Sequence, residues 1–101
     1  MNTRGKQSNP NSLLYDAFLK LKNRDEVYAF LTDLCTVPEM LAMEQRFEVA
    51  RLLDEGVIYA EIEERTGASS ATVSRVNRFL NYGYGAEGYH MVLDRMKDDE
   101  E

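Results

Sequence analysis

Residues 59–78 have the sequence YAEIEERTGASSATVSRVNR, and this stretch decides the fold. Gly67 interrupts a helical pattern, and Ser69 or Ser70 can start a second helix by accepting hydrogen bonds from its first free N–H groups. Two short helices joined by a glycine turn form a helix-turn-helix when apolar side chains fix the angle between them. The positions that must then face inward hold Ile62, Ala68, Val73 and Val76. The pattern therefore predicts a helix-turn-helix over about residues 58–81.

The second helix of this motif presents an outer face that suits DNA. Its polar side chains are small hydroxyls followed by two arginines, and no acid lies between Ser69 and Leu80. Hydroxyls can bond base edges or phosphates, and arginine can bind guanine or phosphate with two hydrogen bonds. Small side chains at a helix start also let its N–H groups approach a phosphate. We predict that the DNA-binding residues are Ser69, Ser70, Ala71, Thr72, Ser74, Arg75 and Arg78.

Ser70, Thr72, Ser74 and Arg75 are the side chains expected to contact base edges. The alternative for Arg75 and Arg78 is that both are ordinary solvated surface arginines. The two interpretations differ in whether a change to alanine affects DNA binding.

Apolar periodicity predicts further helices on both sides of the motif and no strand. The first begins at Leu13, with Leu14, Phe18 and Leu21 on one stripe. Residues 23–26 (NRDE) and 36–39 (TVPE) have the form of capping boxes, so a helix should follow each. The segment 39–54 has more apolar positions than one buried stripe needs, which indicates that its helix is covered on two sides.

Gly56 is predicted to end that long helix, and Gly67 the next one. A last helix is expected over about residues 86–96, with its apolar face formed by Tyr89, Val92, Leu93 and Met96. The predicted organisation is a disordered arm at 1–12, one helical domain at 13–97 and an acidic tail at 98–101. The fold class is therefore all-α.

The net charge of −6 argues against a simple nucleic-acid binder, because DNA affinity is largely electrostatic. The charge is unevenly spread, however. Residues 1–24 hold five bases (Arg4, Lys6, Lys20, Lys22, Arg24) and one acid, whereas residues 87–101 hold six acids and two bases. The local field of the approaching face decides binding, and the face of the second motif helix is free of acids.

The sequence lacks the signals of several other protein classes. It has neither a membrane-spanning apolar run nor the apolar stretch of a signal peptide, so a cytoplasmic protein is expected. Cys35 is the one cysteine and His90 the one histidine, which excludes an internal disulfide and a standard zinc site. Catalysis by Cys35 with His90 would need an orienting group and an oxyanion site that the sequence does not signal. No enzyme activity, metal or cofactor is expected.

From Leu34 to Tyr84 the chain resembles the Trp-repressor superfamily, specifically Trp-repressor-related proteins of the YerC/YecD type. The resemblance is carried by TVPE at 36–39, EQRF at 44–47, DEGVIYAEI at 54–62 and, above all, TGASSATVSRVNRFLNYG at 66–83. It implies six helices and an intertwined homodimer. Two-fold symmetry would place the two recognition helices about 34 Å apart, which suits a palindromic operator in double-stranded DNA.

In the Trp repressor itself, two arginines and a glycine form a pocket for tryptophan. The resemblance implies that Arg75 and Arg46 match the arginines, but Val76 stands where the repressor has its glycine. Valine should fill the space that an indole needs, so L-tryptophan is not the expected effector. Glu63 and Ala60 stand where the repressor has basic DNA contacts, which indicates a different operator or weaker binding. The alternative for Arg46 is an intrahelical pair with Glu39, Glu44 or Glu48.

Two hypotheses about function follow. The first is a sequence-specific transcriptional regulator, a repressor, that binds the major groove as a homodimer. The second is a dimeric helical module that senses a ligand or binds proteins and has no significant DNA affinity, because a fold does not fix a function. Whether a small-molecule effector binds stays open in both.

Overall fold

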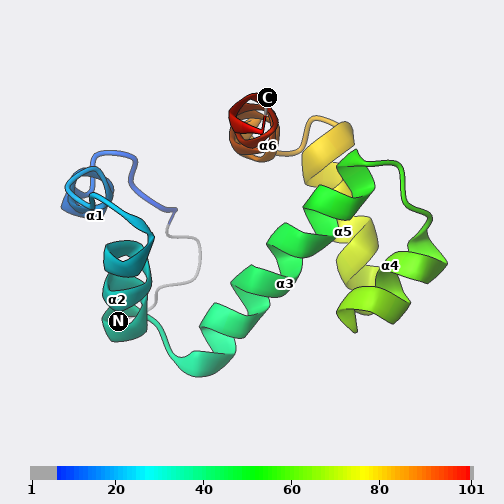
Figure 1. Cartoon of the computed structure of the whole chain (residues 1–101), viewed down its shortest axis with the longest axis horizontal. Helices are drawn as coiled ribbons and strands as arrows, with labels where there is room; N and C mark the ends of the chain where they lie inside the picture. Colours follow the sequence, from blue (N-terminus) through cyan, green and yellow to red (C-terminus); the bar gives the residue numbers. More distant parts are fainter. Residues whose placement is uncertain (1–6, 101) are drawn as a thin grey trace. The chain divides into compact units, whose positions relative to one another are not determined.

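The computed structural model describes residues 7–100, which form six α-helices and contain no strand (Figure 1). This confirms the all-α prediction for that part of the chain. The chain divides into two units between Val37 and Pro38. Residues 1–6 of the predicted disordered arm, and Glu101 of the predicted acidic tail, lie outside the described residues. Residues 9–12 form a turn in which the Ser12 N–H donates to the Asn9 carbonyl oxygen at 3.0 Å.

The first unit contains α1 (Leu13–Phe18) and α2 (Arg24–Leu34). The Asn23 side chain accepts from the Glu26 N–H at 3.0 Å, as predicted for the cap of α2. The Glu26 carboxylate, however, accepts from the Lys22 N–H at 2.8 Å, so it satisfies the residue before the cap. The first hydrogen bond of the capping box is therefore present, but the second comes from Lys22 in place of Asn23.

The stripe predicted for the first helix is wrong at Leu21, because α1 ends at Phe18. The N–H groups of Leu19, Lys20 and Leu21 donate in succession to the carbonyls three residues earlier, at 3.0–3.2 Å. Such i→i+3 bonds tighten the end of a helix. Asn23 is then extended, with φ −158°, so the backbone leaves the helical direction before α2 begins.

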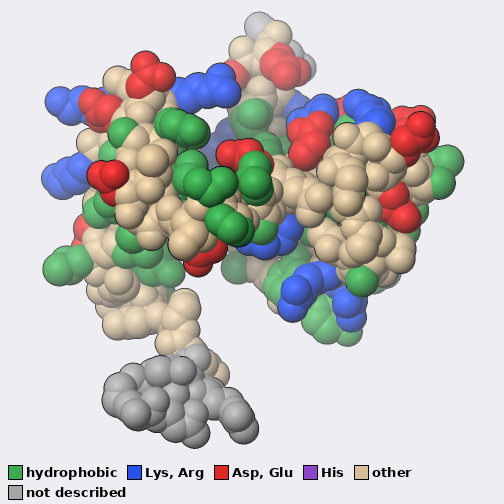
Figure 2. Space-filling model, turned by 90° about the horizontal axis from the view of Figure 1, so that it is seen from below, with side chains coloured by type: hydrophobic (Ala, Val, Ile, Leu, Met, Phe, Trp, Pro, Cys, Tyr) green, Lys and Arg blue, Asp and Glu red, His purple; other side chains and the backbone are tan. Residues whose placement is uncertain are grey.

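Neither helix of the first unit has a buried residue, although both are rich in apolar side chains. Phe18 and Phe30 form an edge-to-face pair with ring centroids 5.4 Å apart. Leu13 and Leu19 nevertheless remain 80% and 82% exposed. Hydrophobic side chains are also visible among the charged ones on the surface in Figure 2. The described residues of this unit thus form no hydrophobic core of their own.

The second unit contains most of α3 (Val37–Asp54) and all of α4 (Tyr59–Thr66), α5 (Ser70–Asn81) and α6 (Gly88–Asp99). Its core draws on all four helices and on the α4–α5 turn, and consists of Val49, Ala50, Leu52, Ile62, Ala68, Val73, Val76, Leu80 and Leu93. Burial of these side chains is the main source of stability in the unit. It holds the helix-turn-helix against α3 and α6.

Helix α3 begins at Val37, directly after Thr36, as the capping box at 36–39 predicts, and Pro38 lies in its first turn, where proline is tolerated. At its other end Gly56 has φ +83°; its N–H donates to Leu53 and that of Val57 to Leu52, both at 3.0 Å. This is the Schellman pattern, and it confirms Gly56 as the glycine that ends the helix. Leu41 is 58% exposed, so one part of the apolar surface of α3 is uncovered in the single chain.

Helix α6 starts two residues later and ends three residues later than predicted, so Asp98 and Asp99 are helical. Of its predicted apolar face, Leu93 is buried and Tyr89 is half-buried, whereas Val92 and Met96 are exposed. Lys97 in the last turn suits the negative end of the helix dipole and supports the extension.

Candidate DNA-binding helix-turn-helix

The turn between α4 and α5 depends on one glycine and one hydroxyl. Gly67 has φ +72°, the left-handed region that glycine adopts without strain, and its N–H donates to the Glu63 carbonyl at 2.9 Å. The Thr66 hydroxyl donates to the Ile62 carbonyl at 2.7 Å and accepts from the Ala68 N–H at 3.1 Å. The helix end predicted at Gly67 is confirmed.

The residues predicted to fix the motif all face inward. Ile62 and Val73 are fully buried, and Ala68 and Val76 are almost so. A side-chain hydrogen bond also ties the motif to α3, because the Gln45 amide donates to the Thr66 carbonyl at 3.2 Å. The angle between α4 and α5 is therefore set by packing, and the turn is attached to the long helix.

Ser69 caps the start of α5: its hydroxyl oxygen accepts from the Thr72 N–H and the hydroxyl donates to Thr72 Oγ1, both at 3.1 Å. The Ser69 side chain is therefore engaged as a helix cap in the free protein. The other predicted contact residues lie on the outer face, where Ser70, Ala71, Ser74, Arg75 and Arg78 are exposed and Thr72 is partly exposed. The helical spacing thus brings the predicted residues to one surface.

Four of the predicted residues line a shallow hollow of about 260 Å³, namely Ala71, Thr72, Arg75 and Arg78. Two guanidinium groups beside a hydroxyl offer several hydrogen-bond donors to one anion. Such a set of donors suits an anion such as a phosphate. This is the arrangement expected of a phosphate contact on a recognition helix.

The first helix of the motif has the opposite charge. Exposed Glu61 and Glu64 and partly exposed Glu63 lie on α4, and Arg65 pairs with Glu61 at 3.1 Å. Because phosphate repels carboxylates, the glutamates of α4 weaken its contacts with a DNA backbone, and its one arginine is paired with Glu61. Favourable charge within the motif is therefore concentrated on α5.

A larger cleft of about 340 Å³ lies beside α5 and is lined by Arg46, Arg75, Val76, Phe79 and Tyr89. It brings together the two arginines that the sequence suggested for an effector pocket. Val76 is only 1% exposed and forms part of the wall. Phe79 and Tyr89 were not predicted here: Phe79 follows Arg75 by one helical turn and could have been found by spacing, whereas Tyr89 comes from another helix and has no local signal.

Glu48, one of the acids suggested as a partner of Arg46, pairs with Arg51, whose Nε lies 3.1 Å from Glu48 Oε2. The hydrogen bond from Arg51 lowers the pKa of Glu48, and the same bond raises the pKa of Arg51. Arg51 also contacts Glu55 at 2.6 Å. The intrahelical pair that engages Glu48 is thus centred on Arg51.

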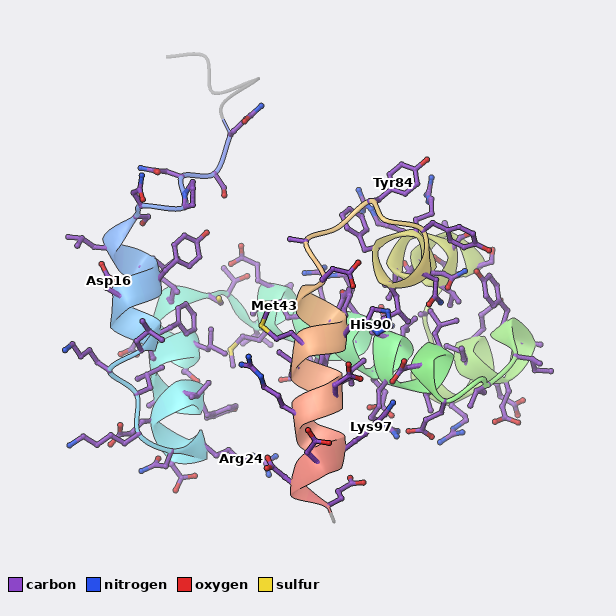
Figure 3. All side chains as sticks on the ribbon, turned by 90° about the horizontal axis from the view of Figure 1, so that it is seen from above. Asp16, Arg24, Met43, Tyr84, His90 and Lys97 are labelled. Atoms are coloured by element: carbon purple, nitrogen blue, oxygen red, sulfur yellow. The ribbon has the colours of Figure 1, made fainter. Side chains whose placement is uncertain are left out.

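His90 connects α6 to the C-terminal end of α5 (Figure 3). Its Nε2 lies 2.7 Å from the Leu80 carbonyl oxygen, and its Nδ1 lies 3.9 Å from Asp54 Oδ1. Lys97 donates to the other oxygen of Asp54 at 2.5 Å, and this hydrogen bond raises the pKa of Lys97. These contacts give His90 a structural role, and the described residues contain no group of three potential metal ligands.

Across residues 7–100, no helix has both the length and the hydrophobicity needed to cross a bilayer.

Comparison with known proteins links this geometry to one family. The family model described as Trp repressor protein matches residues 11–97. The uncharacterized protein YerC of Bacillus subtilis (strain 168) is 53% identical over 87 residues, which cover 86% of this chain and 82% of YerC.

Two solved structures have the same fold. A crystal structure from Staphylococcus aureus, described as a candidate Trp repressor, superposes with a TM-score of 0.81 at 44% identity and covers 96% of this chain and 95% of its own. The crystal structure of a TrpR-like protein from Eubacterium eligens gives a TM-score of 0.78 at 52% identity, with 83% and 84% covered.

Proposed function

Because the chain belongs to the Trp repressor family, as a protein of the YerC type, we propose that it is a sequence-specific DNA-binding regulator of transcription that acts as a repressor. The observation that carries this proposal is the exposed, acid-free outer face of α5 on a motif whose inner face is fully packed. The face offers hydroxyls at the helix start and two arginines one turn further on. It acts by binding, and we assign it no catalytic reaction.

In this proposal Arg75 and Arg78 bind phosphate or guanine, and Ser70, Ala71, Thr72 and Ser74 approach base edges in the major groove. Ser69 contributes by holding the first N–H groups of α5 in place. The hollow between the two arginines supports a phosphate contact. Because the surface of α4 is acidic, its contacts with the phosphate backbone contribute little affinity for DNA. The specific contacts of α5 must supply most of that affinity.

We further propose that the protein acts as a homodimer in the cytoplasm. The exposed Leu13 of α1, Leu19 directly after it and Leu41 of α3 support a partner surface for these helices, as does the absence of buried residues in α1 and α2. A two-fold dimer would also present two copies of α5 to one face of the DNA, at half-sites about one turn apart.

The cleft beside α5 supports a second candidate, a dimeric module that senses a ligand and has no significant affinity for DNA. Arg46 and Arg75 would bind a carboxylate and the aromatic walls an apolar group. The buried Val76 in the wall argues against L-tryptophan as that ligand. A salt gradient on heparin resin separates the candidates, since elution that does not depend on salt favours the sensing module.

The decisive experiment is unbiased selection of double-stranded DNA with the purified protein, followed by affinity measurements at several salt concentrations. The variant Arg75→Ala/Arg78→Ala should lose about 10- to 1000-fold in affinity and reduce the salt slope by about two. Arg51→Ala/Arg65→Ala is the matched control, because it removes the same charge from arginines that pair with glutamates. Equal binding by the two double variants would refute the proposed DNA-binding face.

A further inference from the structure

A short chain of hydrogen bonds connects the two helices of the motif on their outer side. The Asn77 amide nitrogen donates to the Tyr59 hydroxyl oxygen at 2.9 Å, which joins α5 to α4. The Asn81 amide nitrogen donates to Asn77 Oδ1 at 2.7 Å. Because the Asn77 oxygen is engaged by Asn81, the nitrogen side of its amide faces Tyr59. Tyr59 is the first residue of α4, and Asn77 lies in the C-terminal half of α5.

Both residues of this contact lie away from the turn between the helices. Tyr59 precedes Gly67 by eight residues, and Asn77 follows Ser69 by eight residues. At 1.5 Å per residue, each is about 12 Å along its helix from the turn. A displacement of about 1 Å at that distance corresponds to a rotation of about 5° of one helix against the other. A weak contact placed there therefore constrains the angle more than the same contact near the turn.

The other constraints on the angle lie elsewhere. The buried Ile62 and Val73 fix the separation of the helices, and the Gln45 bond to Thr66 attaches the turn to α3. The hydrogen bond between Asn77 and Tyr59 is a third constraint on the angle between α4 and α5. Groups that contact bases must be held within about 10–20° of their working geometry. The bond between Asn77 and Tyr59 thus adds a polar constraint to the apolar packing of Val76 and Leu80, which holds the same half of α5.

From this placement we infer that Tyr59 is a positioning residue for DNA recognition: through Asn77 it restricts the small rotations of α5 that packing leaves, and so the bases that the α5 side chains can reach. Tyr59 has this role only if α5 binds DNA, so it rests on the proposed function. The bond itself exists in the free protein and can be tested there. Asn81 supports it by orienting the Asn77 amide.

The test uses Tyr59→Phe, which keeps the ring and removes the hydroxyl, together with Asn77→Ala and the double variant. Tyr28→Phe is the matched control, because it removes the hydroxyl of a tyrosine that is 63% exposed. In the free protein, Tyr59→Phe should shift the NMR signals of the Asn77 side-chain amide. Tyr28→Phe should leave them in place.

With selected DNA, Tyr59→Phe and Asn77→Ala should each lose about three- to tenfold in specific affinity and accept a wider set of bases. The salt slope should stay unchanged, since no phosphate contact is removed. The double variant should lose no more than either single variant, because both changes break the same bond.

Additive losses, or a loss with Tyr59→Phe alone, would overturn the inference and indicate that the hydroxyl acts independently of Asn77. Unchanged base preference in both single variants would overturn it as well. Failure of the unmodified protein to select any DNA would instead refute the proposed function, while the NMR result would still report whether the bond exists.

Discussion

Replacing Gly67 with alanine tests whether the left-handed turn of the helix-turn-helix is necessary. A Cβ added at Gly67 meets no atom within 4 Å, so the substitution causes no steric clash with its surroundings. Its cost is therefore the backbone cost of holding a residue with a side chain at φ +72°, about 1–2 kcal/mol. In a domain of this size each kcal/mol lowers the melting temperature by about 4–8 °C.

The matched control is Gly88→Ala in the first turn of α6. A Cβ at Gly88 also meets nothing within 4 Å, but the residue lies in a helix, where alanine is favoured over glycine by up to about 1 kcal/mol. Gly67→Asn should lose less than Gly67→Ala, because asparagine tolerates the left-handed region.

Urea unfolding at one fixed protomer concentration measures all three variants, since the stability of a dimer depends on concentration. The free energy of unfolding should fall for Gly67→Ala and stay level or rise for Gly88→Ala. Equal stability changes in the two alanine variants would show that the left-handed conformation of Gly67 does not matter for the fold.

Three further predictions concern the core and the ion pairs. Ile62→Ala should lower the free energy of unfolding by about 2–5 kcal/mol, because a fully buried side chain leaves a cavity; a loss below 1 kcal/mol would show that the core of the motif collapses around it. Arg51 lowers the pKa of Glu48, so the pair stabilises the fold above pH 4.5, the ordinary value for Glu48, and loses this effect as the pH falls through the lowered pKa. The two side chains are 36% and 43% exposed, so the contribution is below about 1 kcal/mol, and Glu48→Gln should make unfolding curves recorded between pH 5 and 3 slightly less pH-dependent. Asp54 raises the pKa of Lys97, so that contact stabilises the fold below pH 10.5 and is lost as the pH rises through the raised pKa. Lys97→Met should reduce the fall in melting temperature above pH 10.5, and an unchanged alkaline slope would exclude a contribution from the pair.

The sequence predicted the helix-turn-helix well because its determinants are local. Gly67, the cap at Ser69 and the spacing of Ile62, Val73 and Val76 lie within one short stretch, and each has a direct conformational meaning. The positions of the polar residues on α5 followed from helical periodicity alone.

Features that depend on distant residues escaped prediction. The bond between Asn77 and Tyr59 joins residues 18 positions apart, and Tyr89 reaches the cleft from another helix. The end of α1 was missed because the apolar stripe that included Leu21 continues in the sequence after the backbone has left the helix. Periodicity reports which residues could share a face, but the length of a helix is decided by hydrogen bonds at its ends.

The lack of buried residues in α1 and α2 has a consequence for how the protein would respond to its own abundance. In the proposed homodimer these helices gain their hydrophobic cover from a second copy, so their stability and the pairing of the two α5 helices arise in one association step. Well below the dissociation constant, the amount of dimer grows with the square of the protomer concentration. A modest change in synthesis or degradation would then produce a larger change in operator occupancy, without any effector.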